Sequence, residues 1–390
     1  AYVGETTSTD PVIVLHFGAL SPAARQNLSA LCRRDRRTFI VVDDVIVTLL
    51  LGARGARLPE LFRLTLPFTY AEPYLTTAGI VPPEMFYGRE RERQEIVDPF
   101  GSCFIYGGRQ LGKRALLRHV QRAFHQPARG QIGLWLNLRA HGIGYDRTVD
   151  EVWDLLADEL KKLGVLPVSL PATTGPDKLL QHAETWLAQD RGRRVLLLLD
   201  EADRFLEEDG RRSDSESLGG VKGEFVRAGR LKGLMDRTER RFKVVFAGLH
   251  NVQRTTRLEN HPLAHYGEAI CIGPLLDDGQ WRQAWELVER PLASIGYQFA
   301  SRDLVTRILS QTNYYPSLIQ LFCNQLLRHV RERHPDLGGP PFLITDQHVE
   351  DAYQSKDLRS AVRDRFRWTL DLDQRYRVIA YCLALHSDEP

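Results

Sequence analysis

Several features that assign a chain to a structural class are scarce in this sequence of 390 residues. No uninterrupted apolar stretch reaches the roughly 18 residues that cross a bilayer, so we expect no membrane partner. Cysteines are few and far apart, without a CxxC pair or a Cys/His cluster, which argues against a disulfide framework and a zinc site. We therefore expect a cytoplasmic protein with reduced core cysteines, which are Cys32, Cys103, Cys271, Cys323 and Cys382.

A marked excess of either charge is also missing. Lys and Arg number 52 against 50 Asp and Glu, a net charge of +2, so the composition gives no overall signal for binding nucleic acid. A local basic run at 33–37 could contact nucleic acid. A solvated helix end is the favoured interpretation, because cations suit the helix dipole there. The sequence thus permits a nucleic-acid partner without indicating one.

The sequence does contain a phosphate-binding pattern. An apolar run at 103–106 predicts a buried strand, two glycines end it, and helical apolar spacing resumes at Leu111. Glycines let several backbone N–H groups point at one anion, the helix dipole adds positive charge, and Lys113 can reach the β- and γ-phosphates. A glycine-rich turn without a ligand is the alternative. We expect ATP or ADP to contact Gly107, Gly108, Arg109, Gln110, Leu111, Gly112, Lys113, Arg114 and Ala115.

One position departs from this pattern. The motif has Ser or Thr after its lysine, because that hydroxyl holds Mg²⁺. Arg114 stands there instead, and a guanidinium offers no acceptor to a metal ion and repels it. Arg114 could touch phosphate directly or turn away on the helix. The pattern therefore predicts nucleotide binding and leaves Mg²⁺ binding and hydrolysis open.

Two further strands end in polar side chains. The apolar run 195–199 leads into Asp200 and Glu201, the Walker B pattern, in which the first acid binds the metal and the second polarises the attacking water. A buried strand that simply ends in acids is the alternative. The run 242–248 is followed by His250 and Asn251. Asn251 is either a catalytic sensor of the γ-phosphate or a residue that caps a turn.

Other parts of the chain surround this core. Residues 1–75 are expected to form a small α/β segment, 76–276 the nucleotide-binding core and 277–370 a helical region. In the first segment, the acidic pair Asp43-Asp44 is predicted to cap a helix that runs to Phe62 rather than to hold a metal. Ahead of the phosphate loop, Phe86 lies in an aromatic turn that could pack on adenine or belong to ordinary core.

The order of these motifs resembles that of the bacterial signal-transduction ATPases with numerous domains, the STAND branch of the AAA-related P-loop ATPases. The resemblance implies an α/β P-loop NTPase core of three layers, with a parallel five-stranded sheet, followed by a helical lid. It covers about residues 80–370 and rests on Phe86-x-Gly88-Arg89-Glu90, the phosphate loop, Leu-Leu-Asp200-Glu201-Ala202-Asp203, Phe246-Ala-Gly248-Leu-His250-Asn251 and Asn313-Tyr-Tyr-Pro316.

The resemblance also implies roles for single residues. Phe86, Gly88 and Arg89 would lie beside the adenine, and Pro316 would contact the nucleotide from the lid. His250 or Asn251 would occupy the sensor position. The winged-helix domain of the family would begin near Asp371, so 371–390 would be its start. Self-association or a protein partner, through flanking domains, is expected.

Four functions remain open. A nucleotide-operated switch, regulatory or defence-type, whose lid closes on the nucleotide and is reset by hydrolysis or exchange, is favoured. Arg114 favours a degenerate scaffold that binds nucleotide and hardly hydrolyses it. A DNA-binding ATPase related to origin loaders shares the core, but no further helicase motif is present. A kinase could use the same loop, but Glu201 argues for water as the acceptor.

Overall fold

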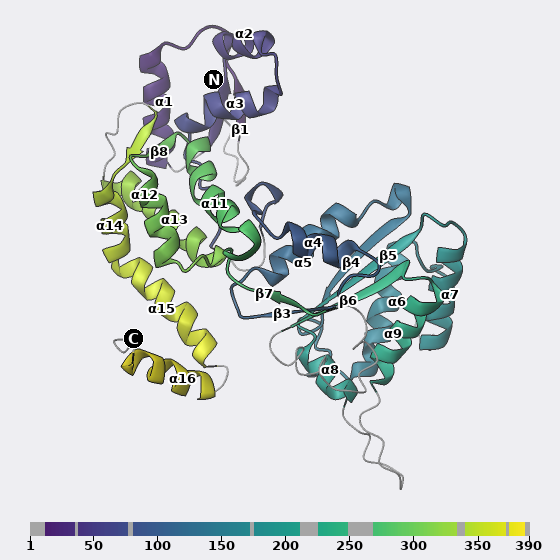
Figure 1. Ribbon diagram of the computed structural model, residues 1–390. Helices are drawn as coiled ribbons and strands as arrows, with labels where there is room; N and C mark the ends of the chain where they lie inside the picture. The colour runs from purple at the N-terminus through teal and green to yellow at the C-terminus, as the bar shows by residue number, and fades with distance from the viewer. Residues whose placement is uncertain are drawn as a thin grey trace. The chain divides into compact units, whose positions relative to one another are not determined.

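The computed structural model describes residues 12–35, 38–76, 81–171, 175–210, 225–248, 268–333, 340–371 and 374–386 (Figure 1). The chain divides into two compact units. Residues 78–274 form one, which we call the sheet unit. Residues 1–77 together with 275–390 form the other, which we call the discontinuous unit because the sheet unit interrupts it in the sequence.

A parallel sheet of five strands forms the centre of the sheet unit. The strands lie in the order β4-β5-β6-β3-β7, so β6 separates the strand before the phosphate loop from the strand that ends in Asp200. Strands β5 and β6 are buried almost throughout, as expected for a parallel sheet covered on both faces. This topology confirms the predicted P-loop NTPase fold. The strands are β3 (Phe104–Gly107), β4 (Gln131–Asn137), β5 (Arg194–Asp200), β6 (Phe242–Gly248) and β7 (Ile270–Ile272).

Helices cover the two faces of this sheet. Helices α6, α7 and α9 pack on β5 and β6 through one large apolar cluster, and α5 contacts β4 and β5 with α4 beside it (Figure 1). The apolar stripe of α5, at Leu116, Leu117 and Val120, is fully buried. The helices and 3₁₀ turns are η2 (Pro83–Met85), α4 (Glu90–Val97), α5 (Lys113–Phe124), η3 (Pro127–Arg129), η4 (Val149–Glu151), α6 (Val152–Lys162), α7 (Pro176–Ala188), α8 (Asp203–Gly210) and α9 (Val226–Arg237).

The discontinuous unit combines two small parallel sheets, β1-β2 and β8-β9, with helices from both ends of the chain. Its N-terminal part contains β1 (Val12–Leu15), α1 (Pro22–Asp35), β2 (Phe39–Val42), α2 (Asp44–Gly52), α3 (Arg57–Thr65) and η1 (Leu66–Phe68). Its C-terminal part contains η5 (Asp277–Gly279), α11 (Trp281–Ser294), β8 (Tyr297–Phe299), α12 (Arg302–Gln311), α13 (Pro316–Arg333), β9 (Phe342–Ile344), α14 (Asp346–Gln354), α15 (Lys356–Leu370) and α16 (Gln374–Leu385).

An extended segment, 69–76, joins these two parts. Tyr74 is only 2% exposed, and its hydroxyl donates to the carbonyl of Val288 on α11 at 2.6 Å. The carbonyl of Tyr74 accepts from the Asn324 amide of α13 at 3.2 Å, and Arg331 donates to the carbonyl of Ala71 at 2.8 Å. Polar side chains of α13 thus hold the backbone of a segment that, at the level of sequence, reads as a Pro- and Tyr-rich linker.

Some local predictions are confirmed and others are wrong. Asp43 caps α2, since its carboxylate accepts from the Ile46 amide at 3.0 Å. The expected single helix to Phe62 is instead two helices, because the chain is extended at Ala53. Two cysteines are not core residues. Cys271 and Cys382 are exposed, the first because it lies on the edge strand β7 and the second because no described residue of α16 is buried.

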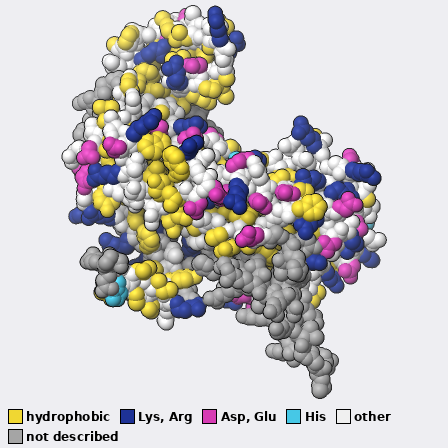
Figure 2. Space-filling view, in the orientation of Figure 1, with side chains coloured by type: hydrophobic (Ala, Val, Ile, Leu, Met, Phe, Trp, Pro, Cys, Tyr) yellow, Lys and Arg dark blue, Asp and Glu magenta, His cyan; other side chains and the backbone are white. Residues whose placement is uncertain are grey.

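The described residues contain no helix that is long and apolar enough to cross a membrane. On the face of the molecule that Figure 2 shows, acidic and basic side chains are interspersed over the sheet unit. This arrangement is in keeping with the nearly balanced charge of the sequence.

Candidate functional site

The loop between β3 and α5 lies at the edge of the sheet where the parallel strands end. Its first glycine, Gly107, has φ 154, and a Cβ there would lie 2.5 Å from the carbonyl oxygen of Ile272. Gln110 and Gly112 also have positive φ, at 67 and 90. No side chain in the described part of the chain caps the N-terminus of α5, which begins at Lys113. Backbone N–H groups and the positive end of the helix dipole are therefore available to an anion.

The ammonium of Lys113 lies on this loop. Its Nζ donates to the carbonyls of Gly107 at 2.5 Å and Gly108 at 2.7 Å. Burial lowers the pKa of Lys113, and the negative charges of Glu201 and Asp200 oppose that shift. The two carbonyls are neutral acceptors. When a phosphate enters the loop, the ammonium of Lys113 can donate to its charged oxygens instead.

The acids at the end of β5 face the start of α5. Asp200 is 3% exposed, and burial raises its pKa against the lowering effect of the Arg114 guanidinium. Asp200 also accepts from the backbone N–H of Glu201 at 3.0 Å, and Glu201 has φ 55, a left-handed conformation that is costly for a non-glycine residue. The Glu201 side chain is 33% exposed.

Arg114 joins both acids. Its Nε donates to Oδ2 of Asp200 at 3.0 Å, and one terminal nitrogen donates to Oε1 of Glu201 at 3.3 Å. Both partners lie more than 80 residues away in the sequence. Arg114 therefore takes neither of the two expected positions: its guanidinium does not turn away from the site, and its donors are directed at carboxylates rather than at the phosphate-binding loop. It neutralises the two carboxylates of the Walker B pattern.

The residues here do not fit a magnesium ion. Mg²⁺ prefers oxygen ligands in octahedral geometry. The residue that supplies a hydroxyl in the usual motif is Arg114, and its guanidinium already bonds to Asp200 and Glu201. Among the residues that the structure describes, no group of three His, Cys, Asp or Glu could hold a metal. The role of Asp200 as a magnesium ligand therefore gains no support from the geometry.

The residues predicted to lie near the adenine have protein partners. Phe86 stacks on His119 of α5, with ring centroids 4.0 Å apart and planes 10° from parallel, and burial lowers the pKa of that histidine. Gly88 has φ 76, which suits glycine. Arg89 is 5% exposed and bonds to Glu92 and to two backbone carbonyls. Adenine contacts for these residues stay predictions.

The remaining predicted site residues are Pro316 and Asn251. Pro316 is the first residue of α13 and belongs to the discontinuous unit. Asn251, like His250, lies outside the described residues. The structure thus brings together the phosphate loop, Lys113, Arg114, Asp200 and Glu201, and it leaves the lid and sensor contacts as predictions.

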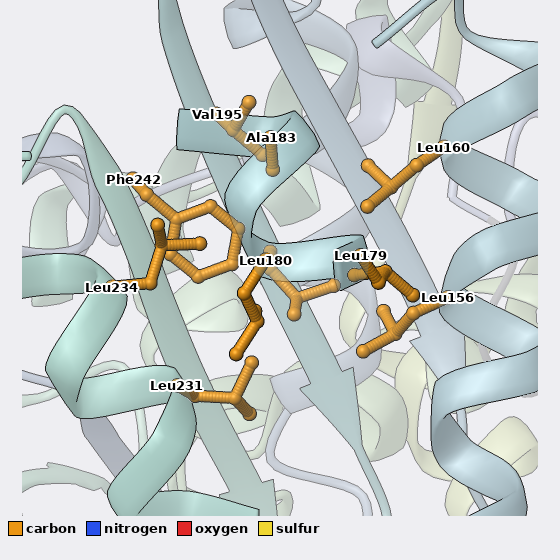
Figure 3. A pocket seen from close by; sticks show the side chains of 10 residues that line it. Leu156, Leu160, Leu179, Leu180, Ala183, Val195, Leu231, Leu234 and Phe242 are labelled. Atoms are coloured by element: carbon orange, nitrogen blue, oxygen red, sulfur yellow. The ribbon is translucent and has the colours of Figure 1, made fainter. Parts of the chain in front are cut away.

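A small cavity lies in the apolar core of the sheet unit and is not lined by residues of the phosphate loop. This cavity, of about 10 Å³, lies between β5, β6 and helices α6, α7 and α9 (Figure 3). It is lined only by apolar side chains, among them Leu180, Leu231 and Phe242, and has barely the volume of one water molecule. It is a packing defect of the core rather than a binding site.

Sequence reasoning missed the partners of Arg89. Glu92 follows Arg89 by three residues at the start of α4, a spacing that places two side chains on one helix face, so this ion pair could have been found. The hydrogen bonds from Arg89 to the carbonyls of Leu111 and Gly273 could not have been predicted, because every residue has a backbone carbonyl and the sequence does not show which one accepts.

No family model matches the chain, and no curated protein matches it. Among solved structures, it is similar to the Walker-type ATPase PABY2304 of Pyrococcus abyssi, with 13% identity, a TM-score of 0.46 and coverage of 75% of this chain and 78% of that one. It is also similar to the Aeropyrum pernix ORC1 protein, solved in complex with DNA, with 15% identity, a TM-score of 0.39 and coverage of 69% and 65%. These distant likenesses assign no function, and we infer function from the residues of this chain alone.

Proposed function

We propose that this protein is an ATP-binding switch of the STAND type, in which nucleotide binding, rather than rapid hydrolysis, is the primary activity. The observation that carries the proposal is the pairing of Arg114 with both Asp200 and Glu201 beside the phosphate loop. The backbone N–H groups of the loop and the ammonium of Lys113 would hold the phosphates.

Arg114 provides the physical reason why the site can bind nucleotide without a divalent cation. In the usual site the metal offsets the charge of the acids that face the triphosphate. Here the fixed cation of the guanidinium does so, because it forms hydrogen bonds to both carboxylates. The same bonds slow hydrolysis, since the Glu201 oxygen that would orient water already accepts from Arg114.

The regulatory part of the proposal rests on the order of motifs and on the two-unit organisation of the chain. A protein that binds a nucleotide and turns it over slowly suits a switch, which has to persist in one state. Self-association or binding of a protein partner would transmit that state.

The test is ATP binding and single-turnover hydrolysis, with and without Mg²⁺, for the native chain, for Arg114→Ser and for a control. Arg122→Ser is the matched control, because Arg122 is exposed on the same helix and contacts only the carbonyl of Val81 among its described hydrogen bonds. We expect the native chain and the control to bind ATP equally with and without Mg²⁺. Arg114→Ser should require Mg²⁺ and should gain turnover in its presence.

Two results would contradict the proposal. Failure of the native chain to bind ATP would refute the proposed function. Mg²⁺-dependent turnover in the native chain, abolished by Glu201→Gln, would show a working ATPase in which Arg114 leaves the acids during the reaction.

A further inference from the structure

Arg89 occupies a costly backbone conformation inside the sheet unit. It precedes α4 with φ 67 and ψ 24, in the left-handed region, and its side chain is 5% exposed. A non-glycine residue in this region is strained, and burying a guanidinium is costly unless its donors are satisfied. Contacts of the Arg89 side chain must therefore hold it there.

Those contacts join three elements. One terminal nitrogen of Arg89 donates to Oε1 of Glu92 on α4 at 3.0 Å. The other donates to the carbonyl of Leu111 in the phosphate loop at 3.3 Å and to the carbonyl of Gly273 just after β7. Gly107 strengthens the same junction, because its Cα lies against the backbone of Ile272. The loop and the end of β7 are thus packed as one piece.

Gly273 lies where the chain leaves the sheet unit. The boundary between the two units falls between Pro274 and Leu275. The N–H of Leu275 donates to the carbonyl of Tyr314 at 2.9 Å, within the discontinuous unit. Tyr314 has φ 57 and stands two residues before α13 begins at Pro316. The connecting segment is therefore held at Gly273 on one side and at Leu275 on the other.

We propose that Arg89 is a positioning residue that couples the state of the phosphate loop to the segment Gly273–Leu275, and through it to the start of α13. The inference rests on the proposed nucleotide binding. When Lys113 donates to a phosphate instead of to the carbonyls of Gly107 and Gly108, the hydrogen bonds that tie the loop backbone to the Lys113 ammonium are lost. The long bond from Arg89 to Leu111 responds, and the guanidinium transmits the change to Gly273.

The experiment is amide hydrogen exchange of the full chain with and without ATP, read at Leu275 and in the first turn of α13. Arg89→Lys retains the charge but replaces the planar fork, whose two terminal nitrogens bond to Glu92 on one side and to Leu111 and Gly273 on the other, with a single nitrogen on a flexible stem. Arg194→Lys is the control, because Arg194 is a partly buried arginine of the same unit and bonds to a backbone carbonyl, that of Val97, at the opposite end of the sheet. Glu92→Gln is a second, milder variant that removes the charge holding Arg89.

We expect ATP to change exchange at Leu275 in the native chain and in Arg194→Lys. In Arg89→Lys and Glu92→Gln, compared at ATP concentrations that saturate each variant, the ATP-dependent difference should fall at least twofold. General destabilisation would raise exchange with and without ATP and leave the difference intact. ATP binding without a change at Leu275, or an unchanged difference in Arg89→Lys, would overturn this inference alone. Absence of ATP binding in the native chain would overturn the proposed function as well.

Discussion

Gly107 shows how a single residue shapes the site. Its φ of 154 and the carbonyl oxygen of Ile272, 2.5 Å from where a Cβ would stand, leave no place for a side chain. We predict that Gly107→Ala lowers the free energy of unfolding by about 1–3 kcal/mol, because backbone must shift in both β3 and β7. Urea denaturation followed by circular dichroism measures the change.

Gly229→Ala provides the control for this prediction. Gly229 lies inside α9, without a positive φ, and a Cβ there would stand in open space. Alanine there should stabilise the chain by about 0.5–1 kcal/mol, since it restricts the unfolded state and favours the helix. Equal effects of the two substitutions would show that the loop tolerates a side chain.

Lys113 should determine the affinity for nucleotide. Each hydrogen bond to a charged group contributes about 1.5–3 kcal/mol, so Lys113→Ala should weaken ATP binding by roughly 10- to 100-fold. Isothermal titration calorimetry measures the affinity. Lys162→Ala removes an exposed lysine of α6 and should leave affinity unchanged. Unchanged affinity in Lys113→Ala would mean that this loop does not bind the phosphates.

At the scale of elements, Lys243 joins the sheet to α4. It lies on β6 and is 2% exposed, and its Nζ donates to the carbonyls of Glu95 at 2.9 Å and Asp98 at 2.6 Å, which end α4. Burial lowers the pKa of Lys243 from 10.5 to about 8. Between these two values the unfolded chain binds more protons than the folded chain, so stability rises with pH.

The predicted rise in the free energy of unfolding between pH 7 and pH 9 is about 1 kcal/mol. Cys103 acts in the opposite direction at higher pH, because burial raises its pKa to about 11, and the range therefore ends at pH 9. Urea denaturation at each pH, for the native chain and for Lys243→Met, isolates the contribution. A rise of the same size in Lys243→Met would assign it to other groups.

Element order could be predicted from the sequence, whereas several side-chain partners could not. The predicted positions of the phosphate loop and of the strand ending in Asp200 are confirmed, because a short apolar run that ends in glycine or in acids is typical of a buried parallel strand. The two partners of Arg114 could not be predicted, because acids more than 80 residues away in the sequence become neighbours only through the order of the strands. The helix break at Ala53 lies within apolar spacing that is compatible with one continuous helix.

At the scale of the whole molecule, the discontinuous unit raises a question of stability. Segment 69–76 lies against α11 and α13 although more than 200 residues separate them in the sequence. If the two ends of the chain fold as one cooperative unit, damage at Tyr74 should spread through the discontinuous unit and spare the sheet unit. An independent N-terminal segment would instead confine the damage to residues 12–76.

Tyr74→Ala tests this alternative. Removing a fully buried aromatic side chain costs about 3–5 kcal/mol, and here the hydrogen bond to Val288 is lost as well. We expect faster hydrogen exchange in α11 and α13 and unchanged exchange in β5 and β6. Tyr353→Ala, at a residue of α14 that is 40% exposed, should change neither set. Protection of α11 and α13 equal to that of the native chain would show that the two ends of the chain are stable independently.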